Sequence, residues 1–173
     1  MQIHFKNQQK SDRLLDLTHP NIMGILNFTP DSFSDSGKFF SLEKMLNDGA
    51  DIIDIGGEST RPNAETVTVS QEIERVVPLV EAVRSRFDCL ISVDSSKAEV
   101  FRESAKAGAD ILNDIRALTE PNALETAAEL DLPVCIMHMQ GSPQTMQQAP
   151  HYEDVVEEVA DFLNHRILEC TLA

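Results

Sequence analysis

Ile52-Ile53-Asp54-Ile55-Gly56-Gly57-Glu58 is a short apolar run that ends at two glycines and a carboxylate. The chain contains five short apolar runs, this one included, and each of them ends at a polar segment. Amphipathic, helix-like stretches separate the runs, which is the pattern of repeated β-α units. In closed parallel sheets the chemistry gathers where the strands end. We therefore expect one pocket at the ends of the five runs, which are Ile22–Leu26, Ile52–Ile55, Leu90–Val93, Ile111–Leu112 and Val134–Met137.

The composition indicates a single domain, residues 1–173, with an acidic surface. Its 42% hydrophobic content is enough to build a core. The 29 acidic and 14 basic side chains give a formal net charge of −15, which argues against nucleic acid or an anionic membrane as a partner. No apolar run approaches the ~20 residues of a membrane span, and the N-terminus lacks the apolar core of a secretory signal. We expect a cytoplasmic protein.

The three cysteines favour the same compartment. Cys89, Cys135 and Cys170 are odd in number and show no Cys-x-x-Cys spacing. Cys89 and Cys135 belong to apolar, strand-like runs, so we interpret them as small core residues of a protein in a reduced cytoplasm.

Each connection between the runs is predicted to contain a helix. The expected helices cover Ser41–Asp48, a segment from a cap at Ser70 to about Phe87, a segment from a cap at Ser95 or Ser96 to Gly108, Pro121–Leu130, and Tyr152–Cys170. In the second of these, Glu72 is placed on the outer face, and Pro78 should kink or split the helix. Residues 1–20 are expected to form a short strand or hairpin that leads into the first run.

The number of units leaves two architectures open. The sequence contains five β-α units, whereas a closed barrel of this type needs eight and typically ~250 residues. The chain is therefore either an open, doubly wound sheet or a barrel that is cut short. A doubly wound nucleotide-binding sheet would carry Gly-x-Gly-x-x-Gly or a Walker loop after its first strand, and neither is present.

Single polar residues at the strand ends are weak signals of function. Asp94 could cap the helix that follows it, Asn113 could satisfy its own turn, and Asn27 could cap a loop. His138, between two methionines, is more often a core histidine than a ligand. Asp54 is harder to dismiss, because an inward carboxylate is costly unless it is paired. The absence of clustered histidines makes a zinc hydrolase a poor interpretation.

As a set, these residues indicate a binding site. Asn27, Asp54, Thr60, Asp94 and Asn113 all lie at or just past strand ends that should share one mouth. Amides and carboxylates there can pair with a ring that carries alternating donors and acceptors, such as a pterin, because a carboxylate accepts two hydrogen bonds from an amidine-like N–H pair. Arg61 is a fork donor suited to an anion such as pyrophosphate.

The amino-acid sequences of these motifs resemble those of the dihydropteroate synthases. The first segment is Met23-Gly24-Ile25-Leu26-Asn27-Phe28-Thr29-Pro30-Asp31-Ser32-Phe33-Ser34-Asp35, and the second is Gly56-Gly57-Glu58-Ser59-Thr60-Arg61-Pro62. Further segments are Ile91-Ser92-Val93-Asp94-Ser95-Ser96-Lys97, Asn113-Asp114-Ile115-Arg116 and Met137-His138-Met139-Gln140-Gly141. The resemblance covers about Leu15 to Cys170.

The resemblance implies a TIM (β/α)8-type barrel in the α/β class, of which about five units are present. The family condenses 6-hydroxymethyl-7,8-dihydropterin pyrophosphate with p-aminobenzoate in folate biosynthesis, and sulfonamides compete there. Carried over, Asp94 and Asn113 would hold the pterin edge, with Asp54 adding polarity. The ring would be walled by Ile115 and Met137, the Mg²⁺ would be bound by Asn27, and the p-aminobenzoate and pyrophosphate region would be shaped by Thr60, Arg61, Pro62 and the loop around Phe33.

Departures from the family pattern leave three functional hypotheses. Family chains continue into segments that resemble Asp-Pro-Gly-Phe-Gly-Phe, Ser-Arg-Lys and Arg-x-His, and none of these occurs here. The helix Ser41–Asp48 is also expected to lack roughly seven residues, about two turns. The leading hypothesis is an incomplete dihydropteroate synthase, which would be a homodimer at full length. The others are a pterin-binding fragment without activity and a methyltetrahydrofolate-type methyltransferase barrel.

Overall fold

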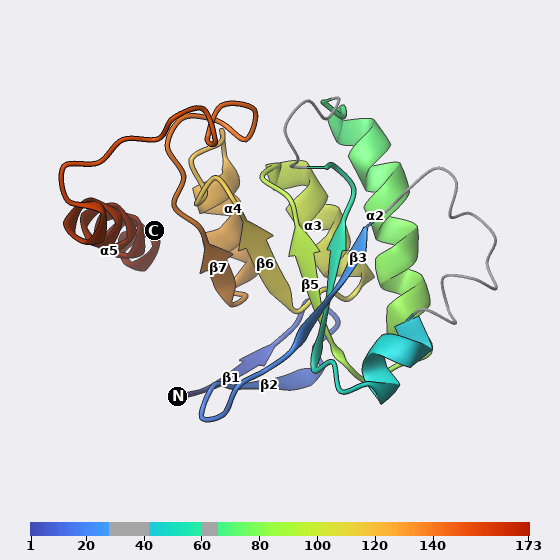
Figure 1. Ribbon diagram of the computed structural model, residues 1–173. Helices are drawn as coiled ribbons and strands as arrows, with labels where there is room; N and C mark the ends of the chain where they lie inside the picture. The colour runs from blue at the N-terminus through green and yellow to red at the C-terminus, as the bar shows by residue number, and fades with distance from the viewer. Residues whose placement is uncertain (28–41, 60–65) are drawn as a thin grey trace.

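A parallel sheet of five strands forms the centre of the molecule (Figure 1). The computed structural model describes residues 1–27, 42–59 and 66–173. The strands are β3 (Met23–Asn27), β4 (Ile52–Gly56), β5 (Leu90–Asp94), β6 (Ile111–Asp114) and β7 (Val134–Ile136). Each of the five predicted apolar runs is therefore confirmed as a strand, with bounds that agree to within one or two residues.

The strand order decides between the two architectures. Every strand pairs in parallel with the next one in the chain, in the order β3-β4-β5-β6-β7. A doubly wound sheet would reverse its order at a switch point. Because β-α-β crossovers are right-handed, an unbroken order places all the helices on one face, and the opposite face becomes the inside of a barrel. The chain therefore forms five consecutive units of a (β/α)8-type barrel.

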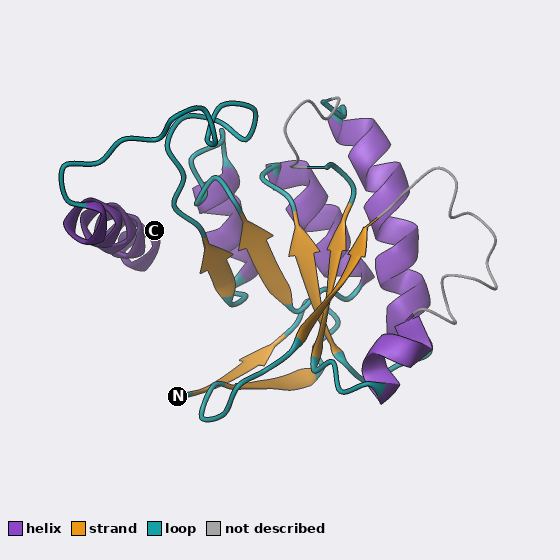
Figure 2. Ribbon diagram, viewed as in Figure 1, coloured by secondary structure: helices purple, strands orange, loops and turns teal. Residues whose placement is uncertain are grey.

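Three helices cover the outer face of the sheet (Figure 2). They are α2 (Val69–Arg84), α3 (Ala98–Ala107) and α4 (Ala123–Leu130). A further helical segment, residues 42–47, precedes β4, and Gly49 follows it with a φ of +104°. The last helix, α5 (Val155–Leu172), follows the long connection after β7. The outer face of the sheet is thus packed along most of its width.

Helix α2 begins at a different cap from the predicted one. The Thr68 side chain accepts a hydrogen bond from the Gln71 backbone N–H, and the Gln71 side chain accepts one from the Thr68 backbone N–H at 3.0 Å. This capping box satisfies two N–H groups at once, which Ser70 could not do. The prediction that Pro78 splits the helix is wrong, because α2 is continuous through it. Pro78 is exposed, so the carbonyl group deprived of its helical partner faces water.

The caps of the later helices also differ from the prediction. Lys97, and not Ser95 or Ser96, is the N-cap of α3, and no side chain caps that terminus. The predicted stop at Gly108 is confirmed, since its φ of +114° is a conformation that glycine adopts at low cost.

Both C-terminal helices start later than the sequence indicated. Helix α4 starts after Asn122, two residues beyond the predicted start. Helix α5 starts after Asp154, whose carboxylate accepts hydrogen bonds from the backbone N–H groups of Val156 and Glu157.

The core lies between the sheet and its helices, and a hairpin closes the N-terminal end of the strands. The largest core cluster joins strand and helix residues: Leu26, Ile53, Ile55, Val76, Val80, Val83, Ile91, Val93 and Val100. Strands β1 (Gln2–Lys6) and β2 (Asp12–Asp16) pair antiparallel, which confirms the predicted hairpin. Leu15 of this hairpin packs on Ile52 and Ile111 at the lower end of the inner face.

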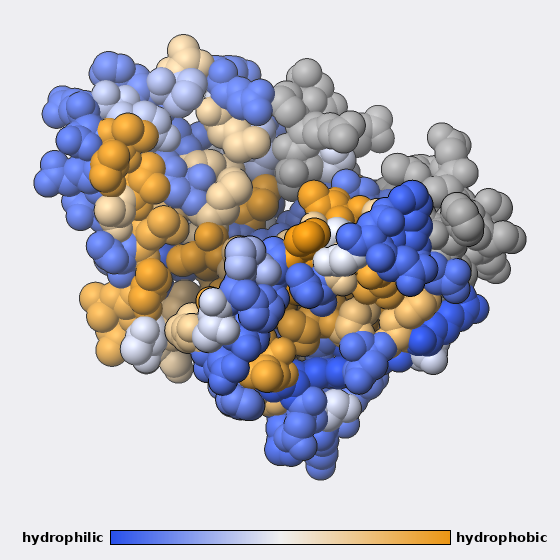
Figure 3. Space-filling model, turned by 60° about the horizontal axis from the view of Figure 1, so that its bottom comes forward, coloured by the Kyte–Doolittle hydropathy of each residue, from blue (hydrophilic) through white to orange (hydrophobic). Residues whose placement is uncertain are grey.

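The inner face of the sheet is partly open to solvent. Ile25 on β3 is 61% exposed, and Met23 is 38% exposed. Cys135 on β7 is also exposed, so its prediction as a core residue is wrong. The apolar run was read correctly as a strand, but this thiol points to the barrel side, which only five strands surround. In Figure 3, where the bottom of the molecule is turned toward the viewer, hydrophobic residues, coloured orange, are visible at the surface. None of the described helices is long and apolar enough to cross a membrane.

Candidate functional site

The predicted strand-end residues form one lateral row across the sheet. In the strand registers Asn27 is aligned with Gly56, Gly56 with Asp94, and Asp94 with Asn113. Residues aligned in adjacent parallel strands point to the same face, and this row lies at the carboxyl ends of the strands. The expected convergence on one mouth is therefore confirmed for these residues.

His138 lies apart from this row. Strand β7 ends at Ile136, and the imidazole packs against Tyr152 and Phe162, with ring centroids 5.9 Å and 5.0 Å away. The imidazole is partly buried and belongs to none of the core clusters that the described residues form, so the interpretation as a core histidine is only partly right: its contacts are structural, but they lie at the segment that leads into α5.

Asp54 precedes Gly56 by two residues on β4, so it points to the same face of the sheet, and it contacts Asn113 of the row. Its carboxylate is buried, and the amide Nδ2 of Asn113 lies 3.4 Å from each of its two oxygens. Burial raises the pKa of Asp54 above its ordinary value. The contact also orients Asn113: with Nδ2 turned to Asp54, the amide oxygen is left for another partner. The alternative that Asn113 satisfies its own turn does not hold.

The turn after β6 is organised instead by Asp114. Its two carboxylate oxygens accept hydrogen bonds from the backbone N–H groups of Arg116 and Leu118, both at 2.8 Å. Leu118 adopts a φ of +58°, and this conformation is costly for a residue with a side chain. A fully buried carboxylate thus fixes the loop that carries Ile115.

Asp94 is the most perturbed acid at the strand ends. Burial, followed by the charges of Asp54, Glu72, Asp114 and Glu58, raises its pKa to about 7. In the described parts of the chain, no lysine or arginine forms an ion pair with it. The alternative role as a helix cap is excluded, since Lys97 is the N-cap of α3. A carboxylate held in this way gains most from a ligand that brings its own N–H donors.

Gly56 leaves a gap between two oxygen atoms of the row. A Cβ atom built on Gly56 would lie 3.3 Å from Asn27 Oδ1 and 3.5 Å from Asp94 Oδ2. Oxygen ligands suit Mg²⁺, which uses one or two protein groups and completes its shell with water and substrate phosphates. The residues present therefore fit a metal that a phosphate ligand helps to hold. No group of three or more His, Cys, Asp or Glu among the described residues could bind a metal alone.

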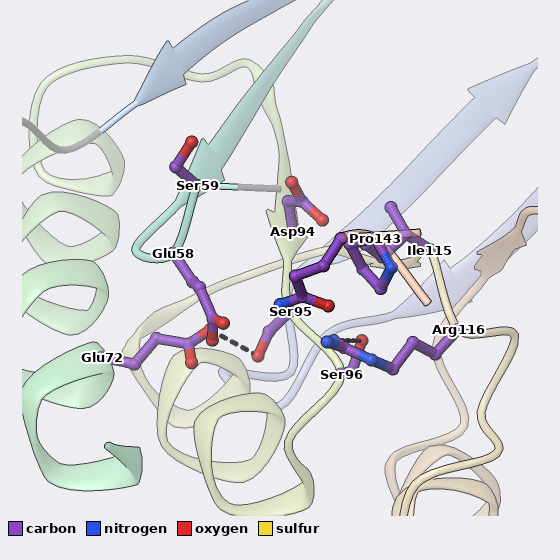
Figure 4. A pocket seen from close by; sticks show the side chains of 10 residues that line it. Glu58, Ser59, Glu72, Asp94, Ser95, Ser96, Ile115, Arg116 and Pro143 are labelled. Carbon is purple, nitrogen blue, oxygen red and sulfur yellow. Dashed lines mark hydrogen bonds between the residues drawn. The ribbon is translucent and has the colours of Figure 1, made fainter. Parts of the chain in front are cut away.

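Two cavities adjoin at the mouth. The first is lined by Asp94 at the end of β5 and by residues from four connections, including Glu58, Ser95, Ile115 and Pro143 (Figure 4). Ile115 and Met137, the two predicted walls of the ring site, line the second cavity together. Ile115 and Arg116 belong to the lining of both cavities, so the two cavities are neighbours at the carboxyl ends of β5 and β6. Thr60, Arg61, Pro62 and Phe33 lie outside the described residues.

Sequence reasoning missed the polar residues behind the row. Glu72 was placed on the outer face of its helix, yet it is 1% exposed and contacts Ser95 and Lys97. The signal was present, because Glu72 precedes the buried Val76 by one helical turn and so shares its face. Gly57 permits the close approach, since a Cβ atom there would lie 2.9 Å from Glu72 Cγ.

The chain resembles known pterin enzymes in sequence and structure. It matches the family model described as pterin binding enzyme over residues 23–173. A dihydropteroate synthase of Haemophilus influenzae is 66% identical over 170 residues, which cover 94% of this chain and 62% of that protein. The dihydropteroate synthase of Escherichia coli K12 is 59% identical over 166 residues, with 92% and 59% covered.

Solved structures give the same relationship. The crystal structure of a Yersinia pestis dihydropteroate synthase with a sulfonamide drug matches with a TM-score of 0.88 at 50% identity, and the match covers 98% of this chain and 63% of that chain. The chain thus spans about 60% of the length of these relatives.

The alignment lengths bear on the predicted short helix. The H. influenzae alignment is 170 positions long and covers 94% of the 173 residues of this chain, which is about 163 residues. About seven positions of the alignment are therefore opposite no residue of this chain. The placement of these positions in the first helix stays a prediction. Because the family model matches almost the whole sheet and its helices, the chain belongs to the pterin binding enzyme family.

Proposed function

We propose that this chain carries the N-terminal five units of a dihydropteroate synthase, which condenses 6-hydroxymethyl-7,8-dihydropterin pyrophosphate with p-aminobenzoate to give 7,8-dihydropteroate and pyrophosphate. The observation that carries the proposal is the row of Asn27, Gly56, Asp94 and Asn113, with Asp54 beneath it. The identity of 66% to a protein of that name adds to it.

Asp94 and Asn113 would recognise the edge of the pterin ring. A carboxylate accepts two hydrogen bonds from the ring N–H and the exocyclic amino group, and two charge-assisted bonds offset the desolvation of a buried acid. Asn113, held by Asp54, presents its amide oxygen as a further acceptor. Ile115 and Met137 would cover the apolar faces of the ring, since both line the adjoining cavity.

The leaving group would lie on the Asn27 side of the row. Asn27 would hold Mg²⁺ together with pyrophosphate oxygens, and a bound Mg²⁺ would neutralise negative charge on the leaving group. The carbon–oxygen bond breaks with its electron pair going to pyrophosphate, and a ring nitrogen stabilises the cation at the exocyclic carbon. The arylamine nitrogen then forms the new bond and loses a proton. The protein mainly orients and stabilises charge, and no described side chain needs to bond covalently.

The partners at the other substrate follow from the resemblance. Thr60, Arg61, Pro62 and Phe33 would shape the region for p-aminobenzoate and pyrophosphate, where sulfonamides would compete. At full length the protein would be a cytoplasmic homodimer that binds small molecules, without nucleic acid or membrane as a partner. Size-exclusion chromatography with light scattering measures the assembly, and a sulfonamide titration in the activity assay measures the competition.

Activity can be tested with two proteins. The first is this chain, and the second is this chain joined to the part of the H. influenzae relative that lies beyond the aligned region. We expect dihydropteroate to form with the extended protein when both substrates and Mg²⁺ are present. Calorimetry with the pterin pyrophosphate tests binding by the chain alone.

The outcomes separate the three hypotheses. Pterin binding without product from either protein would favour the inactive fragment. Transfer of a methyl group from methyltetrahydrofolate to a corrinoid partner would favour the methyltransferase barrel. An extended protein that forms product equally well with Asp94→Ala would overturn the site assignment.

A further inference from the structure

Lys97 joins three acceptors through its ammonium group. Nζ lies 2.5 Å from Glu58 Oε2, 2.5 Å from Glu72 Oε2 and 2.7 Å from the carbonyl oxygen of Val67. An ammonium group has three N–H donors, so all of them are used. Glu58 and Val67 lie at the two ends of the connection between β4 and α2. One side chain from the loop after β5 therefore holds both ends of the preceding connection.

Glu72 is the buried centre of this arrangement. One carboxylate oxygen contacts Lys97, and the other accepts a hydrogen bond from Ser95 Oγ at 2.6 Å (Figure 4). A carboxylate that is 1% exposed is tolerated only with such partners. We call Glu58, Glu72, Ser95 and Lys97 the Glu72 cluster. Two of its members belong to the loop that directly follows Asp94.

The neighbouring residue of the same loop is held from the other side. Ser96 Oγ is hydrogen-bonded to the buried Asp114 carboxylate and accepts a hydrogen bond from Arg116 Nη1 at 3.1 Å. The Ser95 backbone N–H also donates to the carbonyl oxygen of Asn113 at 3.1 Å. Each residue between Asp94 and α3 is thus bonded to another element. The strand end that carries the acid is fixed on both sides.

Lys97 itself is absent from the residues that line the cavity at Asp94, whereas Glu58, Glu72 and Ser95 line it. Its influence on a ligand must therefore pass through these neighbours. The Lys97 ammonium group also forms ion pairs with the carboxylates of Glu58 and Glu72, which both act electrostatically on the Asp94 carboxylate. A hydrogen-bonding pair with a planar ring requires the acid to be placed within a fraction of an ångström.

We propose that Lys97 is a positioning residue for pterin binding, which fixes the Asp94 strand end through Glu72 and Ser95 and ties it to the connection after β4. This inference rests on the proposed function, because it takes the pterin as the ligand of Asp94. It assigns no contact between Lys97 and the substrate.

The test measures the dissociation constant of 6-hydroxymethyl-7,8-dihydropterin pyrophosphate with Mg²⁺ by calorimetry, in the chain and in the extended protein. We expect Lys97→Met to weaken binding by at least about tenfold, and Lys97→Arg to restore it to within about threefold. Lys106→Met is the matched control, since Lys106 forms an exposed pair with Glu103 on α3, and it should leave the affinity unchanged.

Two further variants keep the test decisive if Lys97→Met does not fold. Glu72→Gln combined with Lys97→Met leaves the net charge of the cluster unchanged, so a loss of affinity then reports lost positioning and not lost charge. Ser95→Ala keeps every charge and removes the hydrogen bonds of Ser95 Oγ to Glu72 and to the Lys97 backbone N–H, and it should weaken binding by a smaller factor. Circular dichroism verifies the fold of each variant.

The outcomes distinguish the inference from the proposed function. If the unmodified proteins bind the pterin but form no product, the proposed function fails, while the affinities of the variants still decide the role of Lys97. Equal affinities for the unmodified protein, Lys97→Met and the double variant would overturn the inference. So would an affinity that Lys97→Arg does not restore, or the absence of pterin binding by both unmodified proteins.

Discussion

Two aspartates at opposite ends of the sheet have contrasting surroundings. Asp110, before β6, is fully buried and surrounded by donors: it forms ion pairs with Arg84 and Arg13 and accepts hydrogen bonds from Asn7 Nδ2 and the Ile91 backbone N–H. Asp94, at the end of β5, has four carboxylates among its electrostatic neighbours. The N-terminal end of the strands thus holds a fully compensated buried acid, and the carboxyl end, where the proposed site lies, holds an acid without a paired cation.

The largest effect is expected from removing the compensated acid. Asp110→Ala leaves the guanidinium groups of Arg84 and Arg13 without their buried partner, so it should lower the free energy of unfolding by about 3–5 kcal/mol. Chemical denaturation measures this change. Asp88→Ala is the control, since Asp88 pairs with the same Arg13 at an exposed position and should cost less than about 1 kcal/mol. Equal costs for both variants would contradict the contrast between the two ends.

Removing the uncompensated acid should lower the activity without lowering the stability of the fold. Asp94→Ala would remove the two hydrogen bonds proposed to the pterin ring, and we expect kcat/KM for the pterin substrate to fall about 100- to 1,000-fold in the extended protein. Asp48→Ala, at an exposed ion pair with Lys44, should leave kcat/KM unchanged. Steady-state kinetics with varied pterin concentration provides the measurement. An Asp94→Ala protein that loses stability but keeps its turnover would reverse the roles of the two ends.

Ionisation of Asp94 should lower the free energy of unfolding at neutral pH. Its pKa is about 7 in the folded chain and near 3.8 when unfolded, so the folded state binds more protons between these values and loses stability as the pH rises through them. Asp94→Asn cannot ionise and should be more stable than the unmodified chain by on the order of 2 kcal/mol above pH 7. The difference should vanish below about pH 4. Thermal unfolding across pH 4–8 tests this sign, and a stability gain that is independent of pH would refute the electrostatic cause.

The smallest effect is expected at the gap in the row. Gly56→Ala places a methyl group 3.3 Å from Asn27 Oδ1, which should cost less than about 1 kcal/mol of stability. The Mg²⁺ concentration needed for half-maximal activity should rise several-fold, because the space between the two oxygens is filled. Magnesium titrations of activity in the extended protein measure it. An unchanged requirement would place the metal elsewhere.

The sequence was a good guide wherever a residue and its neighbours followed one period. The five runs became strands because short apolar segments between polar loops fit no other element here, and the row followed from parallel register. Glu72 was misplaced because its charge was weighed above its helical phase with Val76. Cys135 was misplaced because an apolar run does not reveal which of its side chains face the inside of the barrel.

Contacts between distant segments could not be read from the sequence at all. The three acceptors of Lys97 come from residues 25 to 39 positions away, and no local pattern pairs any of them with Lys97. The choice between an open sheet and a barrel also depended on strand order, which the runs alone do not contain. Local rules therefore identified the residues aligned at the strand ends, while the contacts that support them are visible only in the three-dimensional structure.

The neighbour-by-neighbour order of the strands has a consequence for the synthesis of the chain. Each strand pairs with the strand made just before it, so the sheet can extend as the polypeptide leaves the ribosome, with every loop to be closed remaining short. The N-terminal hairpin is the exception, because Gln8 bonds to the carbonyl oxygen of Leu130 and Asn7 to Asp110. The hairpin is synthesised first but is thus expected to dock late, after α4 has emerged from the ribosome. By then the four strands β3 to β6 have been synthesised and can have assembled.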